Sequence, residues 1–230
     1  MEAIILAGGR GERLGDAAGG RPKSLVEVAG QPLAAYQVRR LASAGVTRVI
    51  FACAAGDGAL FERELAGLGP EIVAAEEPER LGRGGGLRFA VRARVEDGDV
   101  YALNGDELVD VDYAGLLARH RSRSALATIA VARPKSQFGL VDIGDDDVVR
   151  GFEEAGKVPY WVSCGNYVLA AEALERFPER GDHESTTFPE LVAEGRLHAF
   201  RHEGLWLTVN TPKELRVAAE HVAAHPEWLA

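Results

Sequence analysis

The chain has 230 residues, a formal net charge of −9 and a hydrophobic fraction of 47%. This length allows one sizeable α/β domain, and no apolar run approaches the roughly 18 residues that a membrane span requires. The acidic balance argues against a general nucleic-acid binder, which needs a basic face. Cys53 and Cys164 lie far apart in apolar contexts and no charged-then-apolar leader opens the chain, so we expect a cytoplasmic protein.

The first apolar run, Ala3 to Ala7, is too short for a helix and predicts a central parallel strand. It leads directly into three glycines, Gly8, Gly9 and Gly11. Glycine lets backbone N–H groups approach a ligand closely, and successive N–H groups form an anion-binding nest. Arg13 adds a guanidinium whose fork suits phosphate, and Lys23 follows a stiffening proline. This segment predicts a polyphosphate site.

Two common phosphate loops do not fit this segment. A P-loop requires Gly-Lys-Ser/Thr at the start of its helix, and the chain has no such tripeptide. A dinucleotide fingerprint requires a third glycine where this chain has Leu14. The alternative without function is a flexible turn with solvated basic residues.

Strands and helices alternate through the first half of the chain. Helical spacing covers residues 33–44, 59–68, 83–94 and 113–123, and short apolar runs cover 49–52, 72–74, 100–103 and 125–132. This order predicts a mainly parallel sheet with helices on both faces. Residues 139–144 and 148–152 predict an antiparallel hairpin, and 212–224 a C-terminal helix with proline in its first turn. We expect one domain, 1–230, with a lid-like second half.

Asp106 follows the strand-length run at 100–103, where a parallel sheet presents its carboxyl edge to ligands. A carboxylate at that edge suits Mg²⁺, which binds one or two carboxylates together with phosphate oxygens. The alternative is an Asx turn within Asn-Gly-Asp. Asp110 and Asp112 form a second acidic pair, which we interpret as the cap of the next helix.

The pattern Leu6-Ala-Gly-Gly-x-Gly-x-Arg-Leu14, followed by Pro22-Lys23, resembles the signature of the sugar-1-phosphate nucleotidyltransferases. The resemblance implies a three-layer α/β, Rossmann-like nucleotidyltransferase fold with a nucleotide-binding half (about 1–112) and a sugar-phosphate-binding half (about 113–230). It implies an NTP and a sugar 1-phosphate as substrates, Mg²⁺ as cofactor, and no nucleic-acid or membrane partner; a homo-oligomer is compatible with it. The implied catalytic residues are Arg13, Lys23 and Asp106. The implied nucleotide-binding residues are Leu6, Ala7, Gly8, Gly9, Gly11, Arg13, Lys23, Arg83, Gly84 and Gly85.

The last three of these belong to Leu81-Gly-Arg-Gly-Gly-Gly-Leu87, which resembles the base-facing loop of the family, with Arg83 in place of a threonine. Arginine reads guanine O6 and N7 elsewhere, which favours GTP, and UTP and CTP remain open. Resemblance to short mannose- or heptose-1-phosphate guanylyltransferases also points to GTP. The alternative is a glycine-rich helix start.

Near the C-terminus, Trp206-Leu-Thr-Val-Asn-Thr-Pro212 departs from the family pattern Trp-x-Asp-x-Gly-Thr-Pro, whose aspartate completes the metal site. Thr208 replaces that aspartate and Asn210 the glycine. Other branches, including acetylglucosamine-phosphate uridylyltransferases and molybdenum-cofactor guanylyltransferases, have an asparagine near the metal. The resemblance therefore implies Asp106 and Asn210 as metal ligands; the alternative for Asn210 is a helix cap.

In the second half, Gly151-Phe-Glu-Glu-Ala-Gly-Lys157 stands where relatives have Phe-x-Glu-Lys-Pro. The resemblance implies a sugar-phosphate site formed by Asn104, Gly139, Glu154, Lys157 and Asn166. Three other functions remain open: a non-catalytic nucleotide sensor, a nucleotidyltransferase with a non-sugar acceptor, and a glycosyltransferase that uses Asp110 and Asp112.

Overall fold

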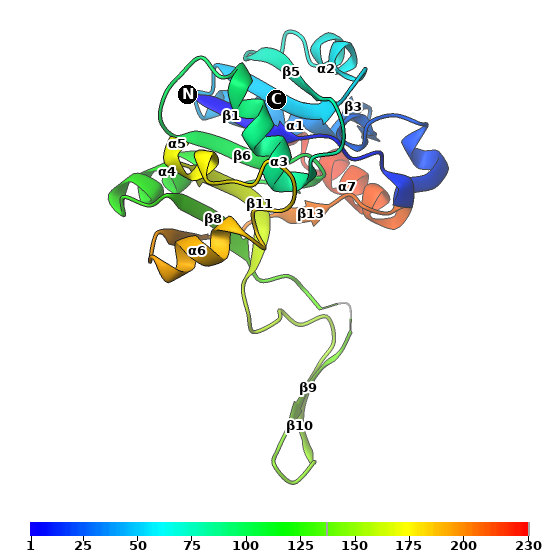
Figure 1. The fold of residues 1–230 in the computed structure, drawn as a ribbon. Coiled ribbons are helices and arrows are strands. Elements are labelled where there is room, and N and C mark those ends of the chain that lie inside the picture. Colours follow the sequence, from blue (N-terminus) through cyan, green and yellow to red (C-terminus); the bar gives the residue numbers. More distant parts are fainter. Residues whose placement is uncertain (137, 230) are drawn as a thin grey trace.

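The computed structural model describes residues 1–136 and 138–229. Its centre is a seven-stranded sheet with the strand order β12-β8-β11-β6-β1-β4-β5 (Figure 1). The strands of this sheet are β1 (Glu2–Leu6), β4 (Arg48–Ala54), β5 (Glu71–Glu77), β6 (Val100–Asn104), β8 (Ala127–Ala132), β11 (Val162–Leu169) and β12 (Leu197–Arg201). β1 pairs in parallel with β4 and β6, β4 with β5, and β8 with β12. The mainly parallel sheet is therefore confirmed.

Two strands of the central sheet, β11 and β12, were not predicted from the sequence. β11 runs antiparallel to both of its neighbours, β6 and β8. The sequence analysis named only one of its residues, Asn166, as part of the sugar-phosphate site. Its sequence, Val-Ser-Cys-Gly-Asn-Tyr-Val-Leu, lacks the continuous apolar run of the parallel strands. The polar residues Ser163 and Asn166 hid the strand signal.

Helices cover both faces of the sheet, as predicted. They are α1 (Leu33–Ser43), α2 (Gly58–Glu64), α3 (Gly82–Ala90), α4 (Tyr113–Ser122), α5 (Ala171–Glu175), α6 (Thr187–Ala193) and α7 (Pro212–Ala224). Side chains alternate along a strand, so Ala3 and Ile5 of β1 join the core under α1, α2 and α4, whereas Ile4 joins the core under α3, α5 and α6. A third core lies between α1 and α7.

Short elements complete the fold. Four are 3₁₀ helices: η1 (Glu12–Ala18), η2 (Lys23–Leu25), η3 (Val91–Ala93) and η4 (Pro226–Leu229). Small two-stranded sheets are formed by β2 (Glu27–Val28) with β3 (Gln31–Pro32), and by β7 (Glu107–Val109) with β13 (Trp206–Thr208). α2 ends at Glu64, earlier than the predicted Leu68, in a segment where Gly67 and Gly69 have positive φ angles.

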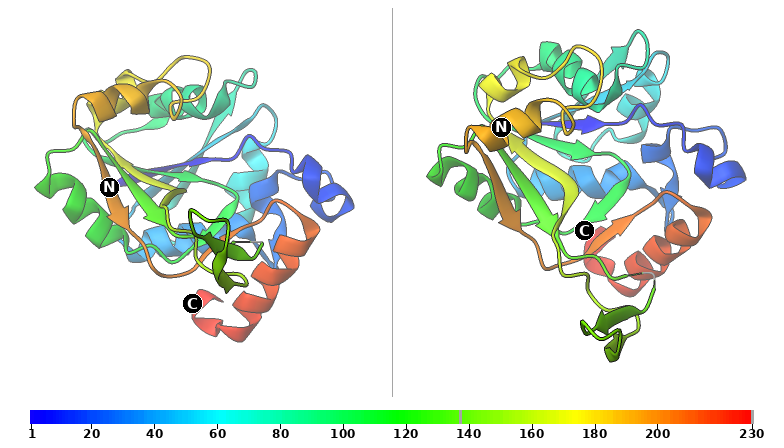
Figure 2. Two further views of the ribbon diagram at one scale, coloured as in Figure 1. Left: turned by 90° about the horizontal axis from the view of Figure 1, so that it is seen from below. Right: turned by 60° about the horizontal axis from the view of Figure 1, so that its bottom comes forward.

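The predicted hairpin is confirmed as β9 (Leu140–Ile143) and β10 (Val149–Glu153). Figures 1 and 2 show that it extends away from the body of the protein and packs on neither face of the central sheet. In the part of the chain that the structure describes, no helix is long and apolar enough to cross a membrane.

Candidate active site

The loops that carry the predicted phosphate and metal residues meet at the carboxyl ends of β1 and β6. The Gly105 N–H donates to the Leu6 carbonyl at 2.9 Å, and the Lys23 N–H donates to the Gly9 carbonyl at 2.9 Å. The Val209 N–H donates to the Asp106 carbonyl at 2.9 Å, which brings the C-terminal segment to the same edge. Backbone bonds thus join three segments that lie far apart in the sequence.

Four side chains converge at this edge. Lys23 Nζ lies 2.6 Å from Asp106 Oδ2 and 2.6 Å from Asn210 Oδ1. Arg13 Nη2 donates to the same Asn210 oxygen at 3.0 Å. Lys23 is buried, while Arg13 and Asp106 are more open to solvent. The arrangement alternates cationic donors with oxygen acceptors, which suits binding a polyphosphate together with a metal ion.

The oxygen atoms of Asp106 and Asn210 fit a divalent cation because both already point at one cation, the Lys23 ammonium. Among the described residues there is no group of three or more His, Cys, Asp or Glu side chains that could enclose a metal. A hard cation that keeps water and phosphate ligands is compatible with two protein oxygens.

The structure separates the two interpretations of Asn210. The cap of α7 is Thr211, whose hydroxyl accepts from the Glu214 N–H, and Glu214 reaches back to the Thr211 N–H at 3.1 Å. The Asn210 side chain is therefore free of capping and faces Lys23 and Arg13. Thr208 instead lies in β13, paired with Glu107 of β7.

The Gly8–Gly11 loop keeps an open backbone. Gly8 and Gly9 are exposed, and no hydrogen bond within the described chain engages their N–H groups. Gly11 has φ +66°, and a Cβ there would lie 3.3 Å from Leu14 Cδ1, so both conformation and packing require glycine. Ala7, by contrast, uses its N–H to extend the sheet, donating to Ala52 at 2.7 Å.

The 81–87 loop is engaged differently from the sequence prediction. The N–H groups of Gly84 and Gly85 donate to the Gly181 carbonyl at 2.9 and 3.3 Å. Cβ atoms at these positions would lie 2.7 Å from the His183 nitrogen and 2.6 Å from the Glu179 carbonyl, respectively. The two glycines therefore admit the 178–183 segment against α3, and their N–H groups are not available to a nucleobase.

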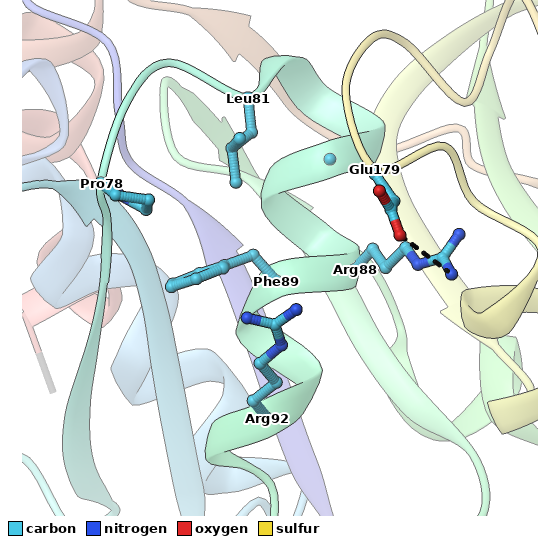
Figure 3. Close-up of a pocket in the computed structure, with 7 residues that line it drawn as sticks. Pro78, Leu81, Arg88, Phe89, Arg92 and Glu179 are labelled. Atoms are coloured by element: carbon cyan, nitrogen blue, oxygen red, sulfur yellow. Dashed lines mark ion pairs between the residues drawn. The ribbon is translucent and has the colours of Figure 1, made fainter.

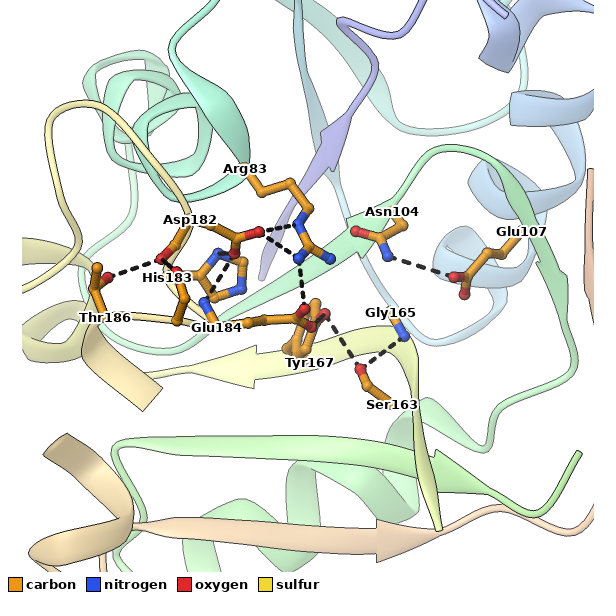
Figure 4. Close-up of polar contacts among 11 residues, drawn as sticks. Arg83, Asn104, Glu107, Ser163, Gly165, Tyr167, Asp182, His183, Glu184 and Thr186 are labelled. Atoms are coloured by element: carbon orange, nitrogen blue, oxygen red, sulfur yellow. Dashed lines mark hydrogen bonds and ion pairs between the residues drawn. The ribbon is translucent and has the colours of Figure 1, made fainter. Parts of the chain in front are cut away.

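Arg83 is likewise occupied. Its Nε donates to Asp182 at 2.8 Å and its Nη2 lies 2.7 Å from Glu184 Oε2 (Figure 4). A guanidinium held by two carboxylates cannot read guanine without releasing them, so the structure gives no support to this predicted role.

The sequence analysis missed Glu77, the last residue of β5. This carboxyl group is buried; one oxygen accepts from the Leu81 N–H at 3.0 Å, and the other lies 3.9 Å from an ideal Cβ at Gly8 and 2.6 Å from one at Gly86. Burial raises the pKa of Glu77 above its usual range. Glu77 therefore lies beside two glycines, one of which belongs to the phosphate loop. In the sequence nothing distinguishes it from the acidic residues around it.

The predicted sugar-phosphate residues are dispersed. Asn166 is buried, with its side-chain carbonyl accepting from the Tyr113 hydroxyl and its amide donating to the Cys164 carbonyl. These contacts give no support to its place in the sugar-phosphate site, which stays a prediction. Glu154 and Lys157 are exposed beyond β10. A Cβ on Gly139 would overlap the Phe152 ring, so this glycine admits an aromatic side chain.

Asn104 lies closer to the convergent site. Its amide donates to Glu107 at 3.4 Å, and both Asn104 Oδ1 and Glu107 Oε2 are buried with no partner among the described residues (Figure 4). Burial and the neighbouring Asp106 raise the pKa of Glu107 well above its usual range. Two unpartnered oxygens beside Asp106 could accept hydroxyl groups. Sequence reasoning missed Glu107 because its burial depends on the pairing of β7 with β13, a strand about a hundred residues later in the chain.

Two cavities lie outside the four convergent side chains, none of which lines either of them. A groove of about 1240 Å³ runs between the foot of the hairpin, β13 and the start of α7, and Lys157, Trp206 and Thr208 are among its lining residues. A smaller cavity of about 250 Å³ follows the outer side of α3 (Figure 3). Of the predicted nucleotide-binding residues, only Gly85 lines this smaller cavity.

The second acidic pair has structural partners. Asp112 caps α4 by accepting from the Gly115 N–H at 2.9 Å, as predicted. Asp110 lies 3.1 Å from His202 Nε2. Because both carboxylates already have partners within the chain, these contacts do not favour the alternative in which Asp110 and Asp112 form the metal site of a glycosyltransferase.

Comparison with known proteins agrees with this geometry. Residues 2–225 match the family model described as nucleotidyl transferase. A mannose-1-phosphate guanyltransferase of Gibberella zeae is 32% identical, and a mannose-1-phosphate guanylyltransferase of Mycobacterium tuberculosis is 30% identical; each alignment covers 93% of this chain and 62% of the relative. The chain thus spans less than two thirds of these relatives.

Among solved structures, HddC from Yersinia pseudotuberculosis has the same fold, with a TM-score of 0.75 at 24% identity over 96% of this chain and 98% of HddC. The family match extends over nearly the whole chain and includes every residue of the convergent site. The chain belongs to the nucleotidyl transferase family.

Proposed function

We propose that this protein transfers a nucleoside monophosphate from an NTP to a sugar 1-phosphate and releases pyrophosphate. The observation that carries the proposal is the contact of Lys23 with both Asp106 and Asn210, beside Arg13 and the open Gly8–Gly11 loop. The mannose-1-phosphate relatives support a sugar phosphate as the acceptor.

The reaction brings two anions together. A phosphate monoester has its second pKa near about 6, so the acceptor is already a dianion near neutral pH and needs no strong general base. The protein must therefore align the acceptor with the α-phosphate and neutralise their charges. The Gly8 and Gly9 N–H groups and Arg13 would hold the triphosphate, and Lys23 would stabilise charge that develops on the α-phosphate.

We propose Mg²⁺ as the cofactor, with Asp106 and Asn210 as its protein ligands. When bound, the ion would supply charge neutralisation at the phosphate oxygens. Since Asn210 is neutral, the protein contributes one carboxylate, and we expect the metal to enter chiefly as the NTP complex.

The acceptor would bind on the side of β6 and β7. Asn104 and Glu107 present unpartnered oxygens there, which suit sugar hydroxyls. In this proposal residues 1–112 bind mainly the nucleotide and residues 113–230 mainly the acceptor, and the large groove, which Lys157 lines, belongs to the second of these halves. Both cysteines are free and buried, which suits a reducing compartment such as the cytoplasm.

We propose GTP as the preferred nucleotide, in agreement with the names of the relatives. The guanine-reading group in this proposal is Glu77 rather than Arg83. A carboxylate can accept from both N1–H and the 2-amino group of guanine, a donor pair that other bases lack, and Glu77 has an oxygen near Gly8 and Gly86.

The test is pyrophosphate release with a panel of NTPs and sugar 1-phosphates. We expect GTP to be preferred and Glu77→Gln to reduce that preference by about 10- to 100-fold, as loss of one good bidentate base contact does. Arg83→Ala serves as the comparison. Unchanged GTP preference in Glu77→Gln, with loss of preference in Arg83→Ala, would return base reading to the arginine.

A further inference from the structure

The projecting hairpin has one continuous apolar face. In β9, Val141 and Ile143 are two residues apart and therefore share a face. Their cross-strand partners are Phe152 and Val149, and directly opposed residues lie on the same face of a two-stranded sheet. All four side chains are between 46% and 68% exposed. Figure 1 shows no other part of the chain against the hairpin.

A β-bulge in β10 places Phe152 on this apolar face. The register shifts between Val149 and Gly151, which leaves Arg150 as an extra residue in β10. Without the shift Phe152 would oppose Leu140, on the other face. With it, Phe152 opposes Val141 and joins the apolar set. The opposite face carries Asp142 and Glu153, so the hairpin is amphipathic although neither face is covered.

An isolated two-stranded hairpin is only marginally stable in water. A hairpin with an exposed apolar face is therefore expected to be covered by a partner. The charges at its two ends indicate which partner.

The tip is acidic and the foot is basic. The turn between β9 and β10 holds Asp145, Asp146 and Asp147. Among the described residues only Asp146 of these three has an ion-pair partner, Arg150 at 3.2 Å. Five cationic side chains line the large groove at the foot: Arg133, Lys135, Lys157, Arg201 and Lys213. None of the five forms an ion pair within residues 1–136 and 138–229. Two carboxylates, Glu203 and Glu214, also line the groove, so it is basic on balance in a chain whose net charge is −9.

We propose that the hairpin is the interface of a two-fold homodimer. The two hairpins pack with their apolar faces together and their long axes antiparallel, so the acidic tip of each hairpin lies against the basic foot of its partner. A two-fold axis makes every such contact twice, so apolar burial and charge pairing are satisfied together.

The spacing along the strands supports this arrangement. The middle of the apolar face lies at the Asp142–Gly151 pair, between the two apolar pairs. From there the tip at Asp146 is four residues away in one direction and Lys157 is six residues away in the other. At about 3.3 Å per residue these distances are at most about 13 and about 20 Å. An axis through the middle of the apolar face would thus leave each acidic tip about 7 Å from its partner's Lys157 along the strands, a gap that a lysine side chain spans. An apolar segment of another protein would fit the face but would not account for this matched charge.

The experiment is sedimentation equilibrium of the full chain over the micromolar range. We expect the wild-type protein to be a dimer. Ile143→Ser should weaken dimerisation by roughly tenfold or more, because it removes apolar side-chain area that the dimer interface buries. The matched control is Asp142→Ser, one residue away on the opposite face, which should keep the wild-type dimer. Circular dichroism and thermal unfolding of each variant check that the body remains folded.

A charge exchange tests the tip-to-foot contact. Asp145→Lys with Asp146→Lys, or Lys135→Glu with Lys213→Glu, should each weaken the dimer, and all four changes in one chain should restore it. A monomeric wild-type protein would overturn the proposal. A dimer that is insensitive to Ile143→Ser, or that responds equally to Asp142→Ser, would overturn it too. Failure of the fourfold variant to recover would overturn the tip-to-foot arrangement.

Discussion

His183 should make the stability of this protein depend on pH. Its ring is fully buried, stacked on Phe177 at 4.7 Å between ring centres and set edge-on to Phe188. Neither ring nitrogen has a hydrogen-bond partner among the described residues. Burial lowers the pKa of His183 from 6.5 to about 4. The folded protein therefore disfavours the imidazolium.

The lowered pKa fixes the direction of the effect. Between pH 6.5 and pH 4 the unfolded chain binds a proton at His183 that the folded chain does not, so stability is fully present above pH 6.5 and falls as the pH drops through this window. For this one group, linkage gives a loss of about 2 kcal/mol at pH 5 relative to pH 8. His183→Phe keeps an aromatic ring in the same packing and removes the titrating nitrogens.

The assay is equilibrium urea unfolding of both proteins at pH 8 and pH 5. We expect the free energy of unfolding of wild type to fall by about 2 kcal/mol more than that of His183→Phe. His225→Phe, at an exposed position, is the control and should follow wild type. If wild type and His183→Phe lose stability in parallel, the buried neutral imidazole is not the cause, and the reasoning fails.

The remaining predictions concern the active site and the loop on α3. Lys23→Ala and Asp106→Ala should remain folded by circular dichroism but lose at least about 100-fold in turnover, as loss of a preorganised charge contact does; wild-type pyrophosphate release by either variant would contradict its assigned role. Asn210→Ala should raise the Mg²⁺ concentration needed for half-maximal rate and Asn210→Asp should lower it, while Thr208→Ala changes little; the reverse pattern would assign the metal contact to Thr208. Gly84→Ala should lower the free energy of unfolding in urea by about 1–3 kcal/mol, because its Cβ would lie 2.7 Å from the His183 backbone nitrogen. Gly9→Ala should leave it unchanged, because a Cβ there would meet nothing within 4 Å. Equal stability of both variants would show that the 178–183 segment is not packed as described.

Sequence reasoning succeeded where local signals were strong. The buried parallel strands, α1, α4, the hairpin and α7 follow from apolar runs, helical periodicity and turn residues. Arg13, Lys23 and Asp106 could be anticipated because each belongs to a spaced motif at the end of a strand, and the structure brings these three side chains to Asn210.

It failed where tertiary partners decide the role. Nothing near Arg83 in the sequence reveals Asp182 and Glu184, which lie about a hundred residues away and occupy its guanidinium. Asn166 looked like a ligand residue because its two partners, Tyr113 and the Cys164 carbonyl, meet it only in the folded core. Glu77 was overlooked because its burial depends on α3 and the phosphate loop.

The most direct test of the proposed activity is ³¹P NMR of the purified chain with GTP, mannose 1-phosphate and Mg²⁺, run beside Lys23→Ala. Nucleotidyl transfer predicts equal amounts of pyrophosphate and a new diphosphate diester, formed by wild type and lost in the variant. Orthophosphate as the product, or tight GTP binding without any pyrophosphate from a panel of sugar 1-phosphates, would contradict it.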